Sequence, residues 1–173
     1  CRAMRKLDSR EVPQEDLEKL IGAANQAPSG SNNQNGRWII VRNQEVKTKL
    51  AELNRAGVES YLAPMIKSPG SLSHQPEDKR RRMLEAVIWQ KEHMHEIPAL
   101  IIACIDFGTI PTPQMFAGGN GSIWPGIQNL LLAARALELG AAPTTLALTD
   151  RDKVAEILNL PETVAAYCLI PVG

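Results

Sequence analysis

The chain has 173 residues with 19 basic and 19 acidic side chains, so its formal net charge at pH 7 is zero. This length suits one domain that buries about two-thirds of its unfolded surface, and the charge balance lacks the basic excess of general nucleic-acid or membrane-surface binders. No apolar run approaches the roughly 20 residues that span a bilayer and no signal-peptide pattern is present, so we expect a cytoplasmic protein.

Hydrophobic spacing and the positions of Pro and Gly predict the elements of the first half. Residues 13–26 are expected to form a helix that opens on Pro13, a residue suited to the first helical position. The other elements predicted here are a strand at 37–42, an amphipathic helix at 44–57, a flexible excursion at 62–76 and a helix at 77–93.

The second half is more apolar. Residues 98–106 are a continuous apolar run of strand length, and the Pro- and Gly-containing stretch 108–121 predicts a mobile loop. The remaining predicted elements are a long apolar helix at 122–140 capped by Gly140, a strand at 142–149, a short helix at 150–160 and a strand at 164–172. This order predicts an α/β or α+β three-layer sandwich without an internal repeat or a second domain.

The helix predicted at 123–139 is apolar on most of its sides. A helix of this kind has to be buried nearly all round, which is hard to complete inside one chain of this size. A homodimer interface is the natural solution.

Histidine and cysteine do not indicate a metal site. His93 and His95 stand two apart, so on a helix their side chains would point about 200° away from each other. Cys1, Cys104 and Cys168 are scattered, without the spacing of a metal site or a disulfide framework, and are expected to be free thiols.

Two polar segments remain open to more than one interpretation. Residues 29–36 carry no hydrophobic side chain between two core elements, so they form either a solvated linker or a surface that holds something. They match neither a phosphate-binding nor a dinucleotide-binding loop, and Ser29 lacks the flanking pattern of a hydrolase nucleophile. Arg2 and Arg5 stand three apart, so they are either solvated charges or, on a helix, a pair that grips an anion.

Five segments in chain order resemble the nitroreductase family of FMN-dependent oxidoreductases. They read "CRAMRKL", "AANQAPSGSNNQNGRWIIV", "IPALIIACID", "IQNLLLAARALELGAAPTTL" and "LNLPETVAAYCLIPVG". The resemblance implies an α+β fold, an α/β/α sandwich in which helices flank a central mixed sheet, with FMN bound at a homodimer interface. Residues 1–173 would be a single FMN-binding domain that lacks the family's C-terminal end, and Cys1 stands where the family has an arginine.

The resemblance also implies which residues bind the cofactor. They are Arg2, Ala3, Met4 and Arg5; Pro28, Ser29, Gly30 and Asn32 of the second subunit; and Pro143, Thr144, Thr145 and Leu146. Arg2 and Ala3 would approach the phosphate and ribityl chain, and Arg5 the N1 and O2 edge of the ring. The backbone N–H groups of Thr145 and Leu146 would face N5 and O4.

The function implied is hydride transfer from NAD(P)H through flavin N5 to an electron-poor small molecule such as a nitroaromatic or a quinone. The flavin carries this chemistry and Arg5 tunes it, so no side chain is expected to be catalytic. Two alternatives stay open: other flavin chemistry, such as dehalogenation or ene reduction, and a flavin-binding dimeric protein without turnover.

Overall fold

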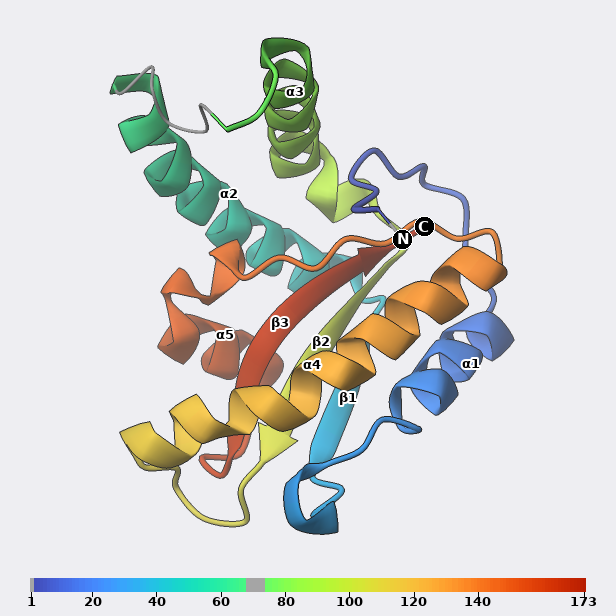
Figure 1. The fold of residues 1–173 in the computed structure, drawn as a ribbon, viewed down its shortest axis with the longest axis vertical. Helices are drawn as coiled ribbons and strands as arrows, with labels where there is room; N and C mark the ends of the chain where they lie inside the picture. The colour runs from blue at the N-terminus through green and yellow to red at the C-terminus, as the bar shows by residue number, and fades with distance from the viewer. Residues whose placement is uncertain (1, 68–73) are drawn as a thin grey trace.

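A three-stranded antiparallel sheet lies at the centre of the fold (Figure 1). The computed structural model describes residues 2–67 and 74–173, and in this part the strands are β1 (Gly36–Val41), β2 (Ala99–Asp106) and β3 (Val164–Val172). β2 pairs with both of its neighbours. Seven of its eight residues are buried, so both faces are covered, and this explains the unbroken apolar run in its sequence.

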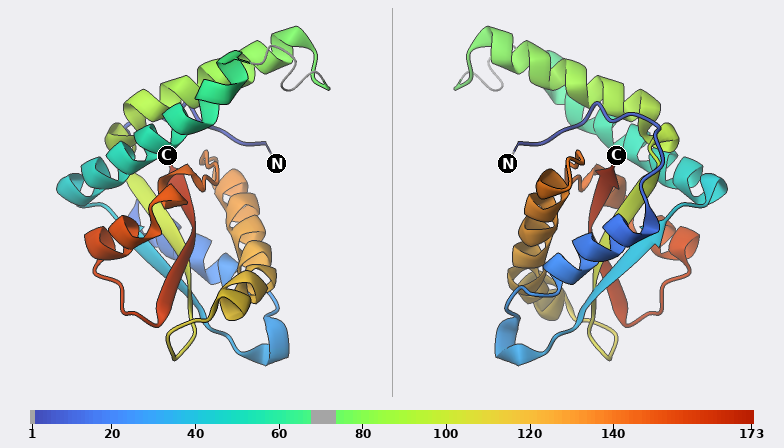
Figure 2. Two further views of the ribbon diagram at one scale, coloured as in Figure 1. Left: turned by 90° about the vertical axis from the view of Figure 1, so that its left-hand side faces the viewer. Right: turned by 90° about the vertical axis from the view of Figure 1, so that its right-hand side faces the viewer.

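Helices cover both faces of the sheet. α1 (Gln14–Ala24) and α4 (Pro113–Ala136) pack on the face that carries Ile101 and Ile105 of β2. The opposite face is covered by α2 (Gln44–Lys67), the 3-10 helix η3 (Leu146–Thr149) and α5 (Arg151–Leu158). α3 (Glu77–His93) runs beside α2 and away from the sheet, and the short helix η2 (Met94–Glu96) leads from it into β2 (Figure 2).

The three layers confirm the predicted α+β sandwich, but two details of the sheet differ from the prediction. The described sheet is antiparallel throughout rather than mixed. Residues 142–149 do not form a strand: Ala141 and Thr144 make single bridges to β3, and the chain then turns into η3. The turn follows because the Thr144 hydroxyl accepts the Leu146 N–H at 3.2 Å, which removes that donor from a strand ladder.

The helix predicted at 122–140 begins earlier and ends earlier than expected. It begins at Pro113, so much of the predicted loop 108–121 is helical, and the Thr112 hydroxyl caps it by accepting the Met115 N–H at 3.3 Å. It ends at Ala136, and the left-handed residue after it is Glu138, with φ 62°, rather than Gly140. Gly140 instead exchanges two backbone hydrogen bonds with Gly173, at 2.7 and 3.1 Å.

The helix predicted at 44–57 continues to Lys67 with Pro64 inside it, so the start of the predicted excursion at 62–76 is helical. The excursion's residues 68–73 lie outside the described part of the chain. In the described ranges no helix combines the length and the apolar character that crossing a membrane requires.

Candidate functional site

The segment before α1 fastens to the turn that follows α4. Residues 2–13 have no regular secondary structure, so Arg2 and Arg5 do not share a helix face. The Met4 N–H donates to the Ala141 carbonyl oxygen at 3.2 Å, and a Cβ at Gly140 would lie 2.5 Å from the Leu7 side chain. The absence of a side chain at Gly140 therefore lets the N-terminal segment lie directly against this turn.

Arg2 faces a cavity that the sequence did not reveal. The cavity measures about 380 Å³ and is lined by Arg2, Ala3, Met4 and Arg135. Arg135 stands in the last turn of α4, in which it is the sole charged residue. No carboxylate lines the cavity, and within residues 2–67 and 74–173 neither arginine side chain has a hydrogen bond or an ion pair. Among the described residues, the cavity is thus a cationic site without a carboxylate counter-ion.

Arg5 points to a different place from Arg2. Its side chain is half-buried; burial lowers the pKa of the guanidinium below its ordinary value, and Tyr61 of α2 acts in the opposite direction. An arginine pKa starts so high that the group stays charged. Arg5 is therefore a partly desolvated cation, whose electrostatic effect on a bound group is larger than that of an exposed one.

Residues 143–146 lie against α2 one turn away from Tyr61. A Cβ at Gly57 would be 2.0 Å from the Leu146 carbonyl oxygen, so the two backbones are in direct contact. The Thr144 hydroxyl lies 3.3 Å from Oδ1 of Asn54, which is buried. α2 thereby brings the loop with Pro143 and Thr145 to the same side of the molecule as Arg5.

The two backbone donors predicted in this loop differ in their surroundings. The Leu146 N–H is already donated to the Thr144 hydroxyl, while Thr144 itself exchanges two backbone hydrogen bonds with Leu169, at 2.8 and 2.9 Å. Thr145 is exposed, and no acceptor for its N–H is found in the described part of the chain. Thr145 is consequently the donor that can bond to a ligand without breaking a bond within the protein.

The polar loop after α1 is ordered by its own hydrogen bonds. The Gly30 N–H donates to Oγ of Ser122 at 3.0 Å, and the Gln34 N–H donates to Oγ of Ser29 at 2.9 Å. Its centre is the short 3-10 helix η1 (Gly30–Asn32), in which Asn32 has φ 53°. Pro28, Gly30 and Asn32 are exposed. A loop held in this way is a fixed surface rather than a loose linker.

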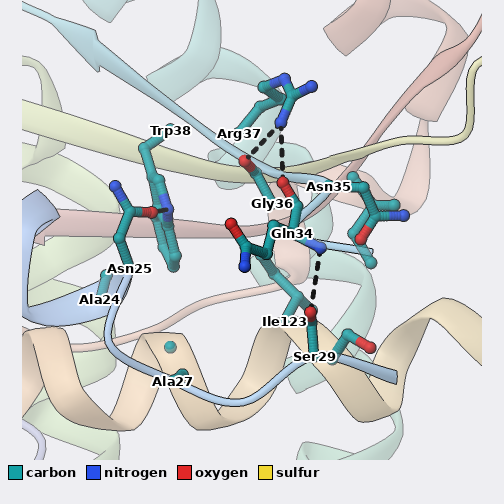
Figure 3. Close-up of a pocket in the computed structure, with 13 residues that line it drawn as sticks. Ala24, Asn25, Ala27, Ser29, Gln34, Asn35, Gly36, Arg37, Trp38 and Ile123 are labelled. Carbon is teal, nitrogen blue, oxygen red and sulfur yellow. Dashed lines mark hydrogen bonds between the residues drawn. The ribbon is translucent and has the colours of Figure 1, made fainter. Parts of the chain in front are cut away.

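Behind this loop lies a second cavity, of about 310 Å³ (Figure 3). Ser29 and Gln34 line it from the loop, and Trp38 lines it from β1. The indole N–H of Trp38 donates to Oδ1 of Asn25 at 3.0 Å, which ties the end of α1 to the sheet.

The polar loop contacts α4 near its middle, at Ser122, whereas the Arg2–Arg135 cavity lies at its C-terminal end (Figure 1). Ser122, which binds the loop, and Arg135 are 13 residues apart on this helix, or about 20 Å at 1.5 Å per residue. One chain does not bring the loop and the cavity together. We therefore expect a site that uses both to take one of them from a second copy of the chain.

His93 and the two buried cysteines, Cys104 and Cys168, are placed for packing rather than for metal binding or nucleophilic chemistry. His93 stacks on Trp89, with ring centroids 4.5 Å apart, and its Nδ1 lies 3.0 Å from a carboxylate oxygen of Glu96. Among the described residues no three His, Cys, Asp or Glu side chains gather as a metal site would require. Burial raises the pKa of the Cys104 and Cys168 thiols to about 12, so neither is a reactive thiolate at neutral pH.

Most of this chain matches one known protein family. A family model described as "Nitroreductase family" matches residues 2–173, nearly the whole chain. The chain belongs to the nitroreductase family. The resemblance read from its five sequence segments is confirmed.

Two relatives of this nitroreductase-family chain carry different names. A putative NADH dehydrogenase/NAD(P)H nitroreductase of Methanothermobacter thermautotrophicus is 29% identical over 174 residues, which cover 99% of this chain and 72% of that protein. An iodotyrosine deiodinase of Thermotoga neapolitana is 26% identical over 172 residues, which cover 99% of this chain and 83% of that protein.

Solved structures share the nitroreductase fold. A structure of oxidized iodotyrosine deiodinase bound to FMN and 3-iodo-L-tyrosine has a TM-score of 0.76 at 24% identity, covering 99% of this chain and 84% of that one. The NADPH:FMN oxidoreductase from Vibrio harveyi, complexed with NAD+, has a TM-score of 0.73 at 19% identity, covering 100% and 64%. At these identities the likeness is one of fold.

Proposed function

We propose that this nitroreductase-family enzyme binds FMN between two copies of the chain and passes hydride from NAD(P)H to an electron-poor acceptor in the cytoplasm. The acceptor class is nitroaromatic or quinone. The observation that carries the proposal is a cationic cavity that no described carboxylate lines, in a chain that matches the family over nearly its whole length. The names of the relatives, which mention FMN, NADH and NADPH, support the choice of flavin and of nicotinamide donor.

The residues present fit the charge of FMN. Its phosphate is a dianion at neutral pH, and guanidinium groups match phosphate oxygens in a bidentate way. In the proposal Arg2 binds this phosphate, with Ala3 and Met4 beside the ribityl chain. Arg5 lies three residues further on, at most about 10 Å along the chain, a reach comparable to a ribityl arm.

The other end of the flavin ring is assigned to the loop that holds Pro143 and Thr144. Reduced flavin is anionic at N1, so an Arg5 cation beside N1 and O2 would favour the reduced form. The exposed Thr145 N–H would donate to the ring near N5, with the Leu146 N–H beside it. The flavin supplies the redox chemistry, and these groups bind it, orient it and set its electrostatic surroundings.

The second copy supplies the wall of Pro28, Ser29, Gly30 and Asn32. Support comes from α4, whose outer face carries Trp124 and Leu132 with 38% and 51% of their surfaces exposed in the single chain. Gln128 and Ala136, one turn further along the same stripe, are also exposed. An apolar stripe of this kind marks an interaction surface, and a homodimer through α4 would bury it.

A second candidate function is reductive dehalogenation by the same flavin. The observation that favours it is the similarity to iodotyrosine deiodinases both in sequence and in fold, with the higher TM-score of the two structures compared above. In that case the acceptor would be a halogenated aromatic. The binding residues proposed for FMN stay the same.

The test is an anaerobic flavin titration. Protein reconstituted with FMN should be yellow, lose its absorbance when NADH or NADPH is added, and recover it when a nitroaromatic or quinone is added. Bleaching by dithionite alone, followed by recovery with 3-iodotyrosine and release of iodide, would favour the dehalogenase. Failure to bind FMN at micromolar concentration would overturn both functions.

A further inference from the structure

We propose that Arg135, which lines the same cavity as Arg2, is a second phosphate ligand of the flavin, and this inference rests on the proposed function. Arg135 lies in the fourth of the five resembling segments, but the resemblance implies no cofactor role for it. The geometry points to it, because Arg135 from α4 and Arg2 from the N-terminal segment line the same cavity.

Three contacts determine where Arg2 and Arg135 stand. The Met4 N–H bond to Ala141 fixes the N-terminal segment two residues after Arg2. The Leu139 N–H donates to the Ala134 carbonyl oxygen at 2.8 Å, and the Leu137 N–H donates to the Ala133 carbonyl oxygen at 3.0 Å, which together fix the end of α4 next to Arg135. The backbone near both arginines is therefore held by hydrogen bonds, while their side chains are exposed and free to contact a ligand.

Within the described part of the chain, Arg2 and Arg135 lack the ionic or hydrogen-bonding partner that most other arginines have. Arg10, Arg37, Arg42, Arg55, Arg81 and Arg82 pair with carboxylates, and Arg151 donates to a backbone carbonyl oxygen. Arg2 and Arg135 share one cavity without any carboxylate. Two cations that line the same small space repel each other, and a bound dianion would turn that repulsion into two charge-assisted contacts.

A purely structural role for Arg135 makes a different prediction. A cation in the last turn of a helix stabilises the helix through its dipole. That effect acts on folding and is the same whether the flavin carries a phosphate or not. The comparison of FMN with riboflavin, which lacks the phosphate, therefore separates the two roles.

The experiment measures the dissociation constants of FMN and riboflavin for wild type, Arg135→Gln, Arg135→Lys and the control Arg10→Gln. Arg10 carries the same charge, and its exposed ion pair is with Asp8. We expect Arg135→Gln to weaken FMN binding about 10- to 100-fold, because one charged hydrogen-bonding group is lost, and to leave riboflavin binding unchanged. Arg135→Lys should retain part of the FMN affinity, and Arg10→Gln should retain all of it.

A double substitution provides an internal check. If Arg2 and Arg135 bind the same phosphate, the losses in Arg2→Gln and Arg135→Gln should not add in the double variant. Unchanged FMN affinity in Arg135→Gln would overturn the inference and leave the proposed function standing. Equal losses for FMN and riboflavin would also overturn it, because the phosphate would then have no part in the effect.

Failure of the proposed function gives a different result from failure of the inference. If wild type binds neither flavin, the proposed function is wrong, and inorganic phosphate alone tests the cavity. A rise in Tm with phosphate that Arg135→Gln abolishes would support an anion site between the two arginines. An equal rise in both proteins, or none in either, would overturn it.

Discussion

At the scale of single residues, Arg5 offers a way to separate redox tuning from binding. Arg5→Gln keeps a hydrogen-bonding group of similar reach but removes the charge. If Arg5 lies beside N1 and O2, it stabilises the anionic reduced flavin more than the oxidised one, so the substitution should lower the reduction potential by tens of millivolts. For a two-electron couple about 30 mV corresponds to about 1.4 kcal/mol.

Equilibrium titration with a reference dye measures this potential. Arg10→Gln is the control for a general change of charge, since Arg10 is exposed and paired with Asp8. A potential equal to that of wild type in Arg5→Gln would mean that Arg5 does not touch the redox end of the ring.

The first resembling segment implied Arg2 and Arg5 as ligands, whereas the fourth segment contains Arg135 but implied no role for it. Periodicity places a residue on the surface of a helix without saying what lies opposite. Here the other arginine of the cavity is Arg2, which is 133 residues away and is positioned by the Met4 bond to Ala141. The lone charge in a run of apolar residues was the sole local signal at Arg135.

At the scale of elements, Gly57 marks the contact on which the loop at 143–146 depends. In Gly57→Ala the new Cβ would meet the Leu146 carbonyl oxygen at 2.0 Å. Because the obstacle is backbone, α2 and η3 would have to move apart. We expect a loss of about 1–3 kcal/mol in the free energy of unfolding, together with weaker flavin binding.

Gly22→Ala is a matched control for this substitution. Gly22 lies inside α1, and a Cβ added there would have no atom of another element within 4 Å. Alanine there should stabilise the protein by about 0.5–1 kcal/mol through its higher helix propensity. Denaturant titration of both variants measures the difference, and equal stabilities would show that α2 and η3 are not in close contact.

The elements that the sequence misjudged are those where tertiary contacts override local propensity. Gly118, Gly119 and Gly121 made residues 108–121 look like a loop. In the structure these glycines lie in α4, and a Cβ at Gly119 would be 2.4 Å from the Tyr167 hydroxyl. Gly119 thus serves close packing of a helix on the sheet, a requirement that propensity alone cannot reveal. The buried strands and α1 were predictable because one dominant signal, hydrophobic patterning, determines them.

At the scale of the whole molecule, the exposed apolar stripe of α4 predicts a homodimer. Its interface should exceed about 2,000 Å², as in obligate dimers. Leu132→Glu places a charge in this stripe. The charge costs little in the single chain, because Leu132 is 51% exposed, but a dimer through α4 would remove it from water. We expect this variant to shift toward monomer and to lose flavin affinity.

Sedimentation at micromolar concentration measures the shift. Gln26→Glu adds the same charge at an exposed position just after α1 and should stay dimeric. A wild-type monomer that retains bound flavin would contradict both the dimer and the shared site.

Because α4 keeps the polar loop and the Arg2–Arg135 cavity apart, two differently damaged chains should restore one site when they form a mixed dimer. Arg2→Ala damages the cavity end and Pro28→Trp obstructs the loop end, so each variant alone should form dimers in which both sites are defective. Refolded together, they should form mixed dimers in which one site receives both intact halves and the other receives both defects. Flavin bound per chain should therefore be higher in the co-refolded mixture than in the same variants refolded apart. If there is no such complementation, the loop and the cavity act within a single chain.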